Sequence, residues 1–418
     1  MKHIYTSLDI GSDTVKVVVC ELYQNKLNLL ASSTFKSKGI KKGLITNPEE
    51  AAISIRGALD RVESILGIKI DKVIASIPSY FAEYTIVKAN IDIENEEGVV
   101  TNNDISMVMD LAIQNSNLED QELVTLLPID FNLDGEYGIK DPLNVAGEKL
   151  GIRAVLVSTP KKNVYSVVGL LESMGITAID ISTNGIGDLY AFKNKNIEKS
   201  IGAIINIGSE TTTVSLYNRG IIVKSKIITM GGKNIDNDIS YMYKTDRRTA
   251  NRLKLKFALG HKRNASTSDM CEIKTAYDDE LRINQYEISE IVSSRIEEIL
   301  NLAKNEINIL TTKRIDYIII TGGTSNMADI EYVANDVFGR DVSIGNVKLV
   351  GIRDNKYSSC VGNIVYYIAK QKLKGVTLSM VDNESASALA SVRKGYNEIN
   401  NEKMLGKLME YFLANRRI

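Results

Sequence analysis

One short pattern occurs twice in this 418-residue chain, and it limits what the chain can fold into. The first copy runs from Leu8 to Val19 and the second from Ile201 to Tyr217. Each copy has an apolar stretch typical of a β-strand, a tip of Gly, Ser and Thr residues, and a second such stretch. A hairpin repeated at so large a separation predicts an internal duplication, with a small polar turn at the end of a buried strand in each half.

The hairpin tips carry groups that can bind phosphate. Their glycines let the backbone approach a ligand, and their hydroxyl and N–H groups can donate to phosphate oxygens. A carboxylate at the end of the first strand could hold a divalent cation through a water molecule, and the lysine that follows supplies a point charge. The candidate residues are Asp9, Gly11, Ser12, Thr14 and Lys16 in the first hairpin and Asn206, Gly208, Ser209, Thr211 and Thr212 in the second.

A third segment completes the predicted site. Ile318 to Met327 runs from a buried strand into a Gly-Gly turn and then a helix, which suits backbone packed against an adenine and ribose. Its candidate residues are Gly322, Gly323 and Thr324. An isolated Asp-x-Gly-Ser tip, as in the first hairpin, is more often an ordinary solvated turn, so the prediction of a nucleotide site depends on the recurrence of the hairpin.

Composition narrows the possible functions. A chain of this length exceeds a single core, and 44% hydrophobic with 25% charged residues is typical of a soluble globular protein. The formal net charge of -1 gives no reason to propose a nucleic acid partner. Two histidines and three widely spaced cysteines argue against a histidine triad, a zinc site or a disulfide framework. With no long apolar window and no signal-peptide core, we expect a cytoplasmic protein.

Two helices are predicted from caps and periodicity. Asn47 should cap a helix that ends near Leu66, with Ile53, Ala58, Val62 and Ile65 on its apolar side. A long amphipathic helix is predicted over 290–309.

The pattern changes between about Tyr84 and Thr159. A strand, a helix capped near Thr101, a strand with a turn-rich loop from Leu126 to Leu143, and a further strand indicate a small α+β insertion. From its residues alone this insertion has no assigned function.

The three nucleotide motifs, in this order, resemble those of the actin and sugar-kinase superfamily, and the insertion resembles subdomain 1C of the bacterial division protein family FtsA. The Leu-Pro, Leu-Asp-Gly and Asp-Pro-Leu groups within Leu126 to Leu143 carry the second resemblance, which extends over about Ile4 to Lys372. It implies an α/β, actin-like fold of two RNase H-like domains with an inserted α+β subdomain 1C and a C-terminal amphipathic helix. The boundaries expected are 1–83, 161–195 and 356–374 for subdomain 1A, 84–160 for 1C, 196–243 and 314–355 for 2A, 244–313 for 2B, 375–401 for a flexible linker and 402–418 for the final helix.

The resemblance implies ATP with Mg²⁺ as ligands and adds Gly231, Gly232 and Lys254 to the site. A solvated helix charge is the alternative interpretation of Lys254, because the acidic residue that often precedes it in the superfamily is here Asn251. The superfamily usually has an aspartate at the position of Asn206. We therefore expect ATP binding with slow or absent hydrolysis, and we assign no catalytic residue.

The resemblance also implies partners. Members of this family polymerise, tether FtsZ filaments to the membrane and work with other divisome proteins at the septum. Arg295 is the residue expected to bind the acidic C-terminal peptide of FtsZ; an ordinary ion pair with Glu298 is the alternative. Two other functions remain open, a small-metabolite phosphotransferase resembling the sugar kinases and a pilus-assembly relative of the same superfamily.

The end of the chain is predicted to bind a membrane surface. A polar stretch from Gly375 to Asn401 has a linker composition, and the amphipathic segment that follows ends in basic residues that suit an anionic bilayer. Docking on the protein's own body is the alternative. The chain is therefore expected to be a peripheral protein at the cytoplasmic face of the membrane. The predicted membrane-binding residues are Met404, Leu405, Leu408, Met409, Phe412 and Leu413.

Overall fold

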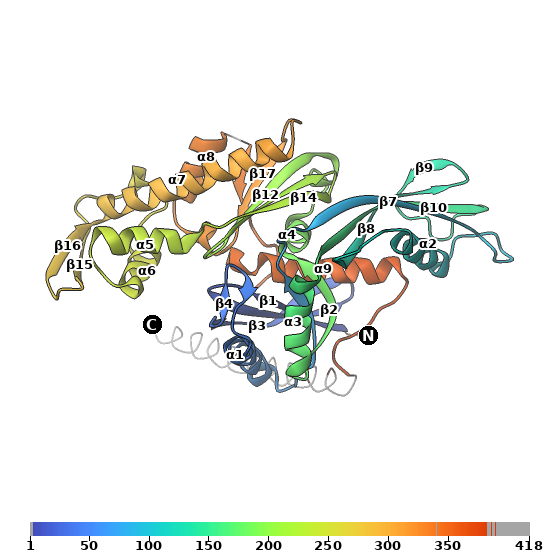
Figure 1. Ribbon diagram of the computed structural model, residues 1–418, viewed down its shortest axis with the longest axis horizontal. Helices are drawn as coiled ribbons and strands as arrows, with labels where there is room; N and C mark the ends of the chain where they lie inside the picture. Colours follow the sequence, from blue (N-terminus) through green and yellow to red (C-terminus); the bar gives the residue numbers. More distant parts are fainter. Residues whose placement is uncertain (1–2, 340, 383–385, 387–388, 390–418) are drawn as a thin grey trace, which may run out of the picture.

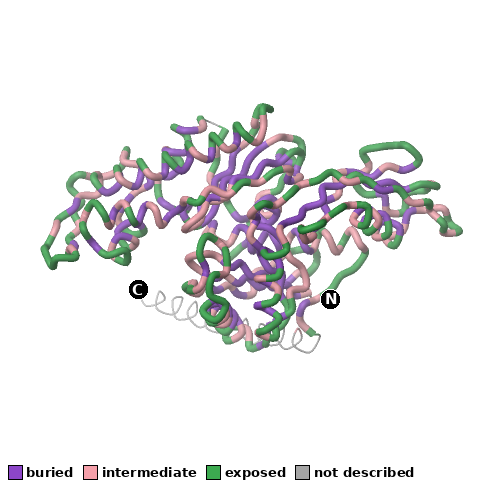
Figure 2. The backbone as a smooth tube through the Cα atoms, viewed as in Figure 1, coloured by how far each residue is buried: buried purple, intermediate pink, exposed green. Residues whose placement is uncertain are grey.

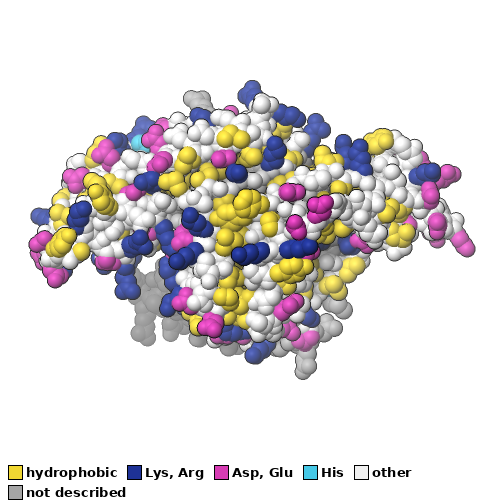
Figure 3. All heavy atoms as spheres, in the orientation of Figure 1, with side chains coloured by type: hydrophobic (Ala, Val, Ile, Leu, Met, Phe, Trp, Pro, Cys, Tyr) yellow, Lys and Arg dark blue, Asp and Glu magenta, His cyan; other side chains and the backbone are white. Residues whose placement is uncertain are grey.

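The computed structural model of the chain describes residues 3–339 and 341–382, together with residues 386 and 389 (Figure 1). Two central sheets lie side by side, and a smaller unit projects at each end of the molecule. Buried residues follow the strands of the sheets and the helix faces turned toward them (Figure 2). Lys, Arg, Asp and Glu side chains are interspersed over the face drawn in Figure 3, in keeping with the balanced net charge.

The first half is built on a five-stranded sheet of order β11-β6-β1-β2-β3. Its strands are β1 His3–Ile10, β2 Thr14–Tyr23, β3 Lys26–Lys36, β6 Lys72–Ile77 and β11 Thr177–Thr183. β1 pairs antiparallel with β2 and parallel with β6. Helices α1 Pro48–Leu66 and α3 Lys161–Ser173 pack on one face, with Leu8, Val17, Ile55 and Leu59 in a shared core. A short hairpin, β4 Ile40–Lys41 and β5 Leu44–Ile45, leads into α1.

The second half repeats this arrangement. Its sheet has the order β14-β13-β12-β17-β18, formed by β12 Ile201–Ile207, β13 Thr212–Asn218, β14 Ile221–Ile228, β17 Tyr317–Thr321 and β18 Val342–Ile344. β12 pairs antiparallel with β13 and parallel with β17, as β1 does with β2 and β6. The duplicated α/β fold predicted from the two hairpins is confirmed.

A lobe of the second half projects beyond this sheet (Figure 1). It contains α5 Gly232–Met242, α6 Arg247–Lys256, the hairpin of β15 Met270–Lys274 and β16 Glu280–Asn284, and the long helix α7 Gln285–Leu310. Helix α8 Ile330–Phe338 packs beside α7. The buried side of α7 carries Val292, Ile296, Ile299 and Leu300, so its apolar stripe faces the core.

The insertion in the first half is a separate unit at the other end of the molecule (Figure 1). Its sheet of order β7-β10-β8-β9 comprises β7 Glu83–Asp92, β8 Gln121–Leu133, β9 Glu136–Ile139 and β10 Lys149–Pro160, with α2 Asn102–Gln114 packed on it. Thr101 and Asp104 form a reciprocal capping box at the start of α2, which satisfies helix N–H groups that have no partner within the helix. Phe131, Leu150 and Ile152 belong to a core of its own.

Two helices run between the halves and pack closely against each other. These are α4 Asn184–Phe192 and α9 Ser358–Leu373. A side-chain carbon at Gly362 would overlap the carbonyl oxygen of Gly187, so only glycine permits this approach. The close packing brings polar side chains of both helices to the boundary between the two sheets.

Two expectations need correction. On α1, Ile53 and Ile65 are 66% and 62% exposed, because the sheet contacts the side of the helix that carries Ile55, Ala58 and Leu59. The expected linker does not begin at Gly375: the backbone N–H of Met380 donates to the carbonyl of Ile4 over 2.9 Å, and the Met380 side chain is buried. The chain therefore remains packed on β1 to about residue 381.

Candidate functional site

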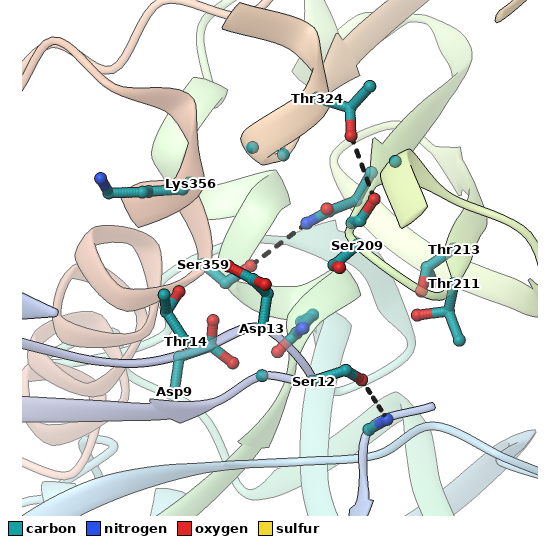
Figure 4. A pocket seen from close by; sticks show the side chains of 18 of the residues that line it. Asp9, Ser12, Asp13, Thr14, Ser209, Thr211, Thr213, Thr324, Lys356 and Ser359 are labelled. Atoms are coloured by element: carbon teal, nitrogen blue, oxygen red, sulfur yellow. Dashed lines mark hydrogen bonds between the residues drawn. The ribbon is translucent and has the colours of Figure 1, made fainter. Parts of the chain in front are cut away.

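A cavity of about 400 Å³ lies between the two sheets. It is lined by the β1–β2 turn, the β12–β13 turn, the turn after β17, and the starts of α5 and α9, so it draws on both halves of the fold (Figure 4). All but two of the predicted nucleotide-site residues line it. Those that do are Asp9, Gly11, Ser12, Thr14, Lys16, Asn206, Gly208, Ser209, Thr211, Gly232, Lys254, Gly322, Gly323 and Thr324.

The two exceptions lie behind the wall of the cavity. The Thr212 hydroxyl donates to the carbonyl of Met230 over 2.9 Å, and this residue is fully buried. Gly231 packs on the β12–β13 turn, where a side-chain carbon would come within 2.7 Å of the Gly208 carbonyl oxygen. Both residues shape the turns, and neither contacts the space between them.

The first hairpin places a charged pair at the cavity floor. Lys16 Nζ lies 2.7 Å from Asp9 Oδ2, and the two side chains are 13% and 7% exposed. Burial alone would lower the pKa of Lys16, but the adjacent Asp9 carboxylate outweighs it, so the pKa is raised and the ammonium is retained. At Gly11 a side-chain carbon would come within 2.8 Å of the Thr14 carbonyl oxygen, so the turn fits only glycine.

In the second hairpin Asn206 is held from two sides. Its Nδ2 donates to the Asp188 carboxylate over 2.7 Å and also lies 3.4 Å from the Ser359 hydroxyl. Asp188 accepts from Ser358 and Ser359, over 2.6 and 2.8 Å. Burial raises the pKa of Asp188 to about 6, and these hydrogen bonds oppose that rise. Sequence analysis did not identify Asp188, which lies on α4 outside every motif.

The α5 and α6 side of the cavity contains a buried ion pair. Lys254 Nζ lies 2.7 Å from Asp236 Oδ1 and donates to the Gly232 carbonyl over 2.8 Å. Both charged side chains are 8% exposed, so the interpretation of Lys254 as a solvated helix charge is wrong. The Asn251 amide donates to the same carboxylate over 3.1 Å. Asp236 thus supplies a carboxylate beside Lys254, where the superfamily often has an acidic residue at the position of Asn251. Asp236 also was not identified from sequence.

The β4–β5 turn closes one end of the cavity, and it too was missed. The Lys42 N–H donates to Glu210 Oε2 over 2.6 Å, and the Gly43 N–H donates to the Ser12 hydroxyl over 2.7 Å. Lys233 Nζ lies 2.6 Å from the other Glu210 oxygen. Burial would raise the pKa of Glu210, but Lys233 and the Lys42 N–H more than compensate and lower it. The Lys-Lys-Gly run before Leu44 was the available sequence signal, since it is typical of a tight turn.

The donor set suits a hydrated cation better than a directly ligated one. Among the described residues, nowhere do three or more His, Cys, Asp or Glu side chains gather closely enough to hold a metal ion. At the cavity, Asp9 and the amide of Asn206 lie among hydroxyls and backbone N–H groups, and the buried Asn184 oxygen has no hydrogen-bond partner. Magnesium keeps most of its water shell and needs one or two carboxylates plus phosphate oxygens, so these residues fit it.

Arg295 lies away from this cavity, on α7. Its Nε and Nη2 form a bidentate pair with Asp238 over 2.6 and 2.8 Å, and Nη1 contacts Glu298. The expected alternative, an ion pair with Glu298, is therefore present together with a stronger pair that was not expected. Tyr241 and Met242, 72% and 58% exposed, line a groove beside the arginine. This groove joins an apolar surface to charges of both signs.

The predicted membrane-binding residues from Met404 to Leu413 lie outside the described residues. Among the helices that the structure describes, none combines the length and the apolar composition needed to cross a bilayer.

Two family models match the chain. The model for cell division protein FtsA matches residues 203–362, and the model for the SHS2 domain inserted in FtsA matches residues 83–158. The chain belongs to the FtsA family. Similar relatives include the cell division protein FtsA of Bacillus subtilis, 28% identical over 89% of this chain and 85% of that protein, and that of Enterococcus faecalis, 25% identical over 98% of each.

Solved structures support the same fold. The chain is similar to the PilM-PilN type IV pilus biogenesis complex, with a TM-score of 0.57 and 13% identity over 87% of this chain and 98% of that one. It is also similar to MreB5 of Spiroplasma citri bound to ADP, with a TM-score of 0.54 and 16% identity over 89% and 98%. These likenesses confirm the actin-like fold. Membership of the FtsA family favours a division protein over a metabolite kinase or a pilus protein.

Proposed function

We propose that this FtsA family protein is an actin-like component of the cell division machinery that binds ATP with Mg²⁺ between its two halves. The observation that supports this most directly is the convergence of three turns, after β1, β12 and β17, on one cavity. Two of these turns come from duplicated hairpins with the same strand pairing. The similarity of the fold to MreB5, whose structures include complexes with ADP and AMPPNP, is consistent with this proposal.

Each side of the cavity has a defined role in this proposal. Lys16 and the N–H and hydroxyl groups of both hairpin turns bind the phosphates, and Asp9 holds a water of the cation. Gly322 and Gly323 give the nucleoside a flat backbone surface, and Lys254 with Asp236 contacts the ribose. Magnesium, when bound, neutralises phosphate charge. Hydrolysis is expected to be slow or absent, because the neutral Asn206 leaves the hairpin turns with one carboxylate for the cation, that of Asp9.

Equilibrium binding of a fluorescent ATP analogue tests this function. Lys16→Ala should weaken binding by roughly tenfold or more, since it removes a charge-assisted contact to phosphate. Lys36→Ala is the matched control, because Lys36 also pairs with an aspartate of the same hairpin, Asp13, but its side chain is 69% exposed. Equal affinity of all three proteins, or no binding by the wild type, would contradict the proposal.

Three further parts of the proposal extend the family role. The groove beside Arg295 binds the acidic C-terminal peptide of FtsZ, residues 404–413 hold the protein on an anionic membrane, and the inserted unit contacts the next molecule in a head-to-tail filament. Together these would tether FtsZ filaments to the membrane at the septum. Electron microscopy on a lipid monolayer tests the filament: a folded protein lacking residues 84–160 should form none, and filaments from it would disprove the contact.

A further inference from the structure

The two hairpins of this chain can be compared residue by residue. The first strand and turn contain the sequence Asp9-Ile10-Gly11-Ser12. The matching stretch of the second hairpin is Asn206-Ile207-Gly208-Ser209. The register agrees as well, since Asp9 lies opposite Lys16 in the β1–β2 pair and Asn206 lies opposite Thr213 in the β12–β13 pair. Asn206 therefore occupies the place in the second half that Asp9 occupies in the first. The second half has a neutral amide where the first has a carboxylate.

A carboxylate from another element lies directly behind that amide. Asp188 on α4 accepts a hydrogen bond from Asn206 Nδ2 over 2.7 Å, although the two residues come from different elements. The Asp188 side chain is 2% exposed and is oriented by the hydroxyls of Ser358 and Ser359 on α9. The negative charge that β12 lacks is thus present a short distance away.

This contact fixes the orientation of the Asn206 amide. Because Asn206 Nδ2 is turned toward Asp188 and Ser359, the other atom, Oδ1, lies against Gly322, where a side-chain carbon would collide with it. Both Asn206 and Gly322 line the cavity. An amide oxygen held in this way can accept a hydrogen bond from a cation-bound water, and a charged partner behind the amide strengthens that hydrogen bond.

We propose that Asp188 is a positioning residue of the cation site, which orients Asn206 toward the water shell of a divalent cation and supplies the second negative charge opposite Asp9. The inference rests on the proposed nucleotide and Mg²⁺ binding and names a residue of that site outside the nucleotide motifs. In the low-dielectric interior a buried charge one residue away acts on the cation more strongly than it would in water.

A purely structural role is the competing explanation. Asp188 joins α4 to α9 through Ser358 and Ser359, so its loss would affect stability in either case. Asp180 is a matched control, because its carboxylate also holds α9, by pairing with Lys370 over 2.8 Å, and its side chain is 10% exposed. Its partner Lys370 does not line the cavity, whereas Asn206 and Ser359, two partners of Asp188, do. A variant of each residue separates loss of helix packing from loss of the cation.

The test compares the affinity of a fluorescent ATP analogue in Mg²⁺ with its affinity in EDTA. The proteins are the wild type, Asp188→Asn, Asp180→Asn and the double variant Asp188→Asn with Asn206→Asp, which exchanges the carboxylate and the amide. The gain from Mg²⁺ is the ratio of the affinity measured in Mg²⁺ to the affinity measured in EDTA. Asp188→Asn should reduce this gain by roughly tenfold or more, which is the usual effect of removing a residue that orients a metal ligand. The double variant should recover most of that gain, while Asp180→Asn keeps it and lowers only the melting temperature.

The inference is overturned if Asp188→Asn keeps the full gain from Mg²⁺, or if the double variant does not recover it. If Asp188→Asn does not fold, the double variant decides: a wild-type gain from Mg²⁺ supports the positioning role, and a lost gain refutes it. Failure of the proposed function gives a different result: the wild type then binds the analogue neither in Mg²⁺ nor in EDTA. In that case the inference about Asp188 fails as well.

Discussion

The backbone N–H of Lys42 donates to the Glu210 carboxylate over 2.6 Å, from the first half of the fold to the second. The contact joins the β4–β5 turn to the β12–β13 turn at the end of the cavity where phosphates are proposed to bind. Lys233 lies 2.6 Å from the other Glu210 oxygen, so a single carboxylate links three elements of the cleft wall. Glu210 should therefore stabilise the arrangement of the two halves.

This contact predicts a pH dependence of stability. The pKa of Glu210 is lowered in the folded protein, so its contribution is fully present above the pKa of the unfolded chain and is lost as the pH falls through the folded value. The melting temperature of Glu210→Gln should therefore fall less steeply on acidification than that of the wild type. Glu96→Gln, at an exposed position of the inserted unit, is the control and should follow the wild type. Parallel curves for Glu210→Gln and wild type would exclude the contribution.

The buried Lys254–Asp236 pair predicts an asymmetric effect of mutation. Lys254→Met should destabilise the protein by roughly 3 to 5 kcal/mol, because it leaves the Asp236 carboxylate buried without its cation. Replacing both residues, as Lys254→Met with Asp236→Leu, should cost less, since no unpaired charge remains. Urea unfolding measures both values. A double variant less stable than the single one would show that the pair is not the source of the effect.

The ion pairs of Arg295 change how its proposed role in FtsZ binding should be tested. Asp238 competes with an acidic peptide for the guanidinium, so Asp238→Asn should raise the affinity for the C-terminal peptide of FtsZ, whereas Arg295→Ala should lower it. Arg282→Ala is the control, because Arg282 forms an exposed pair with Glu272 in the same lobe. Peptide titration followed by fluorescence anisotropy measures the affinities. If neither Asp238→Asn nor Arg295→Ala changes them, Arg295 is not in the peptide site.

The end of the chain is predicted to bind anionic lipid. Full-length protein should pellet with anionic liposomes, and residues 1–401 should remain in the supernatant, because the segment 404–413 carries the apolar side chains expected to enter the bilayer surface. Leu408→Glu with Phe412→Glu should behave like the truncation. Neutral liposomes are the control for the basic residues at 416 and 417. Pelleting of the truncated protein would rule out this anchor.

The parts of the fold that the sequence predicts well are those set by local pattern. The apolar runs around Leu8 and Ile204 are long, end at Gly-Ser turns and recur, so the hairpins, their duplication and most of the cavity lining could be inferred. Strand polarity and turn chemistry determine where Gly11 and Gly208 must lie. The inserted unit could be separated because its pattern changes at both ends.

The missed features depend on contacts between distant segments. Asp188, Asp236 and Glu210 acquire their roles from partners on other elements, and no local pattern distinguishes them from surface acids. The exposure of Ile53 and Ile65 depends on which side of α1 the sheet contacts, which helical periodicity alone does not determine. The burial of Met380 similarly requires knowing that the chain returns to β1.

Hydrogen–deuterium exchange of the wild-type protein, with and without ATP and Mg²⁺, tests most directly the claim that three turns form one nucleotide site. Protection should increase together in the turns after β1, β12 and β17, because each supplies backbone groups to the same ligand. The inserted unit should exchange unchanged. Protection of only one of the three turns, or of none at saturating ATP, would contradict the account.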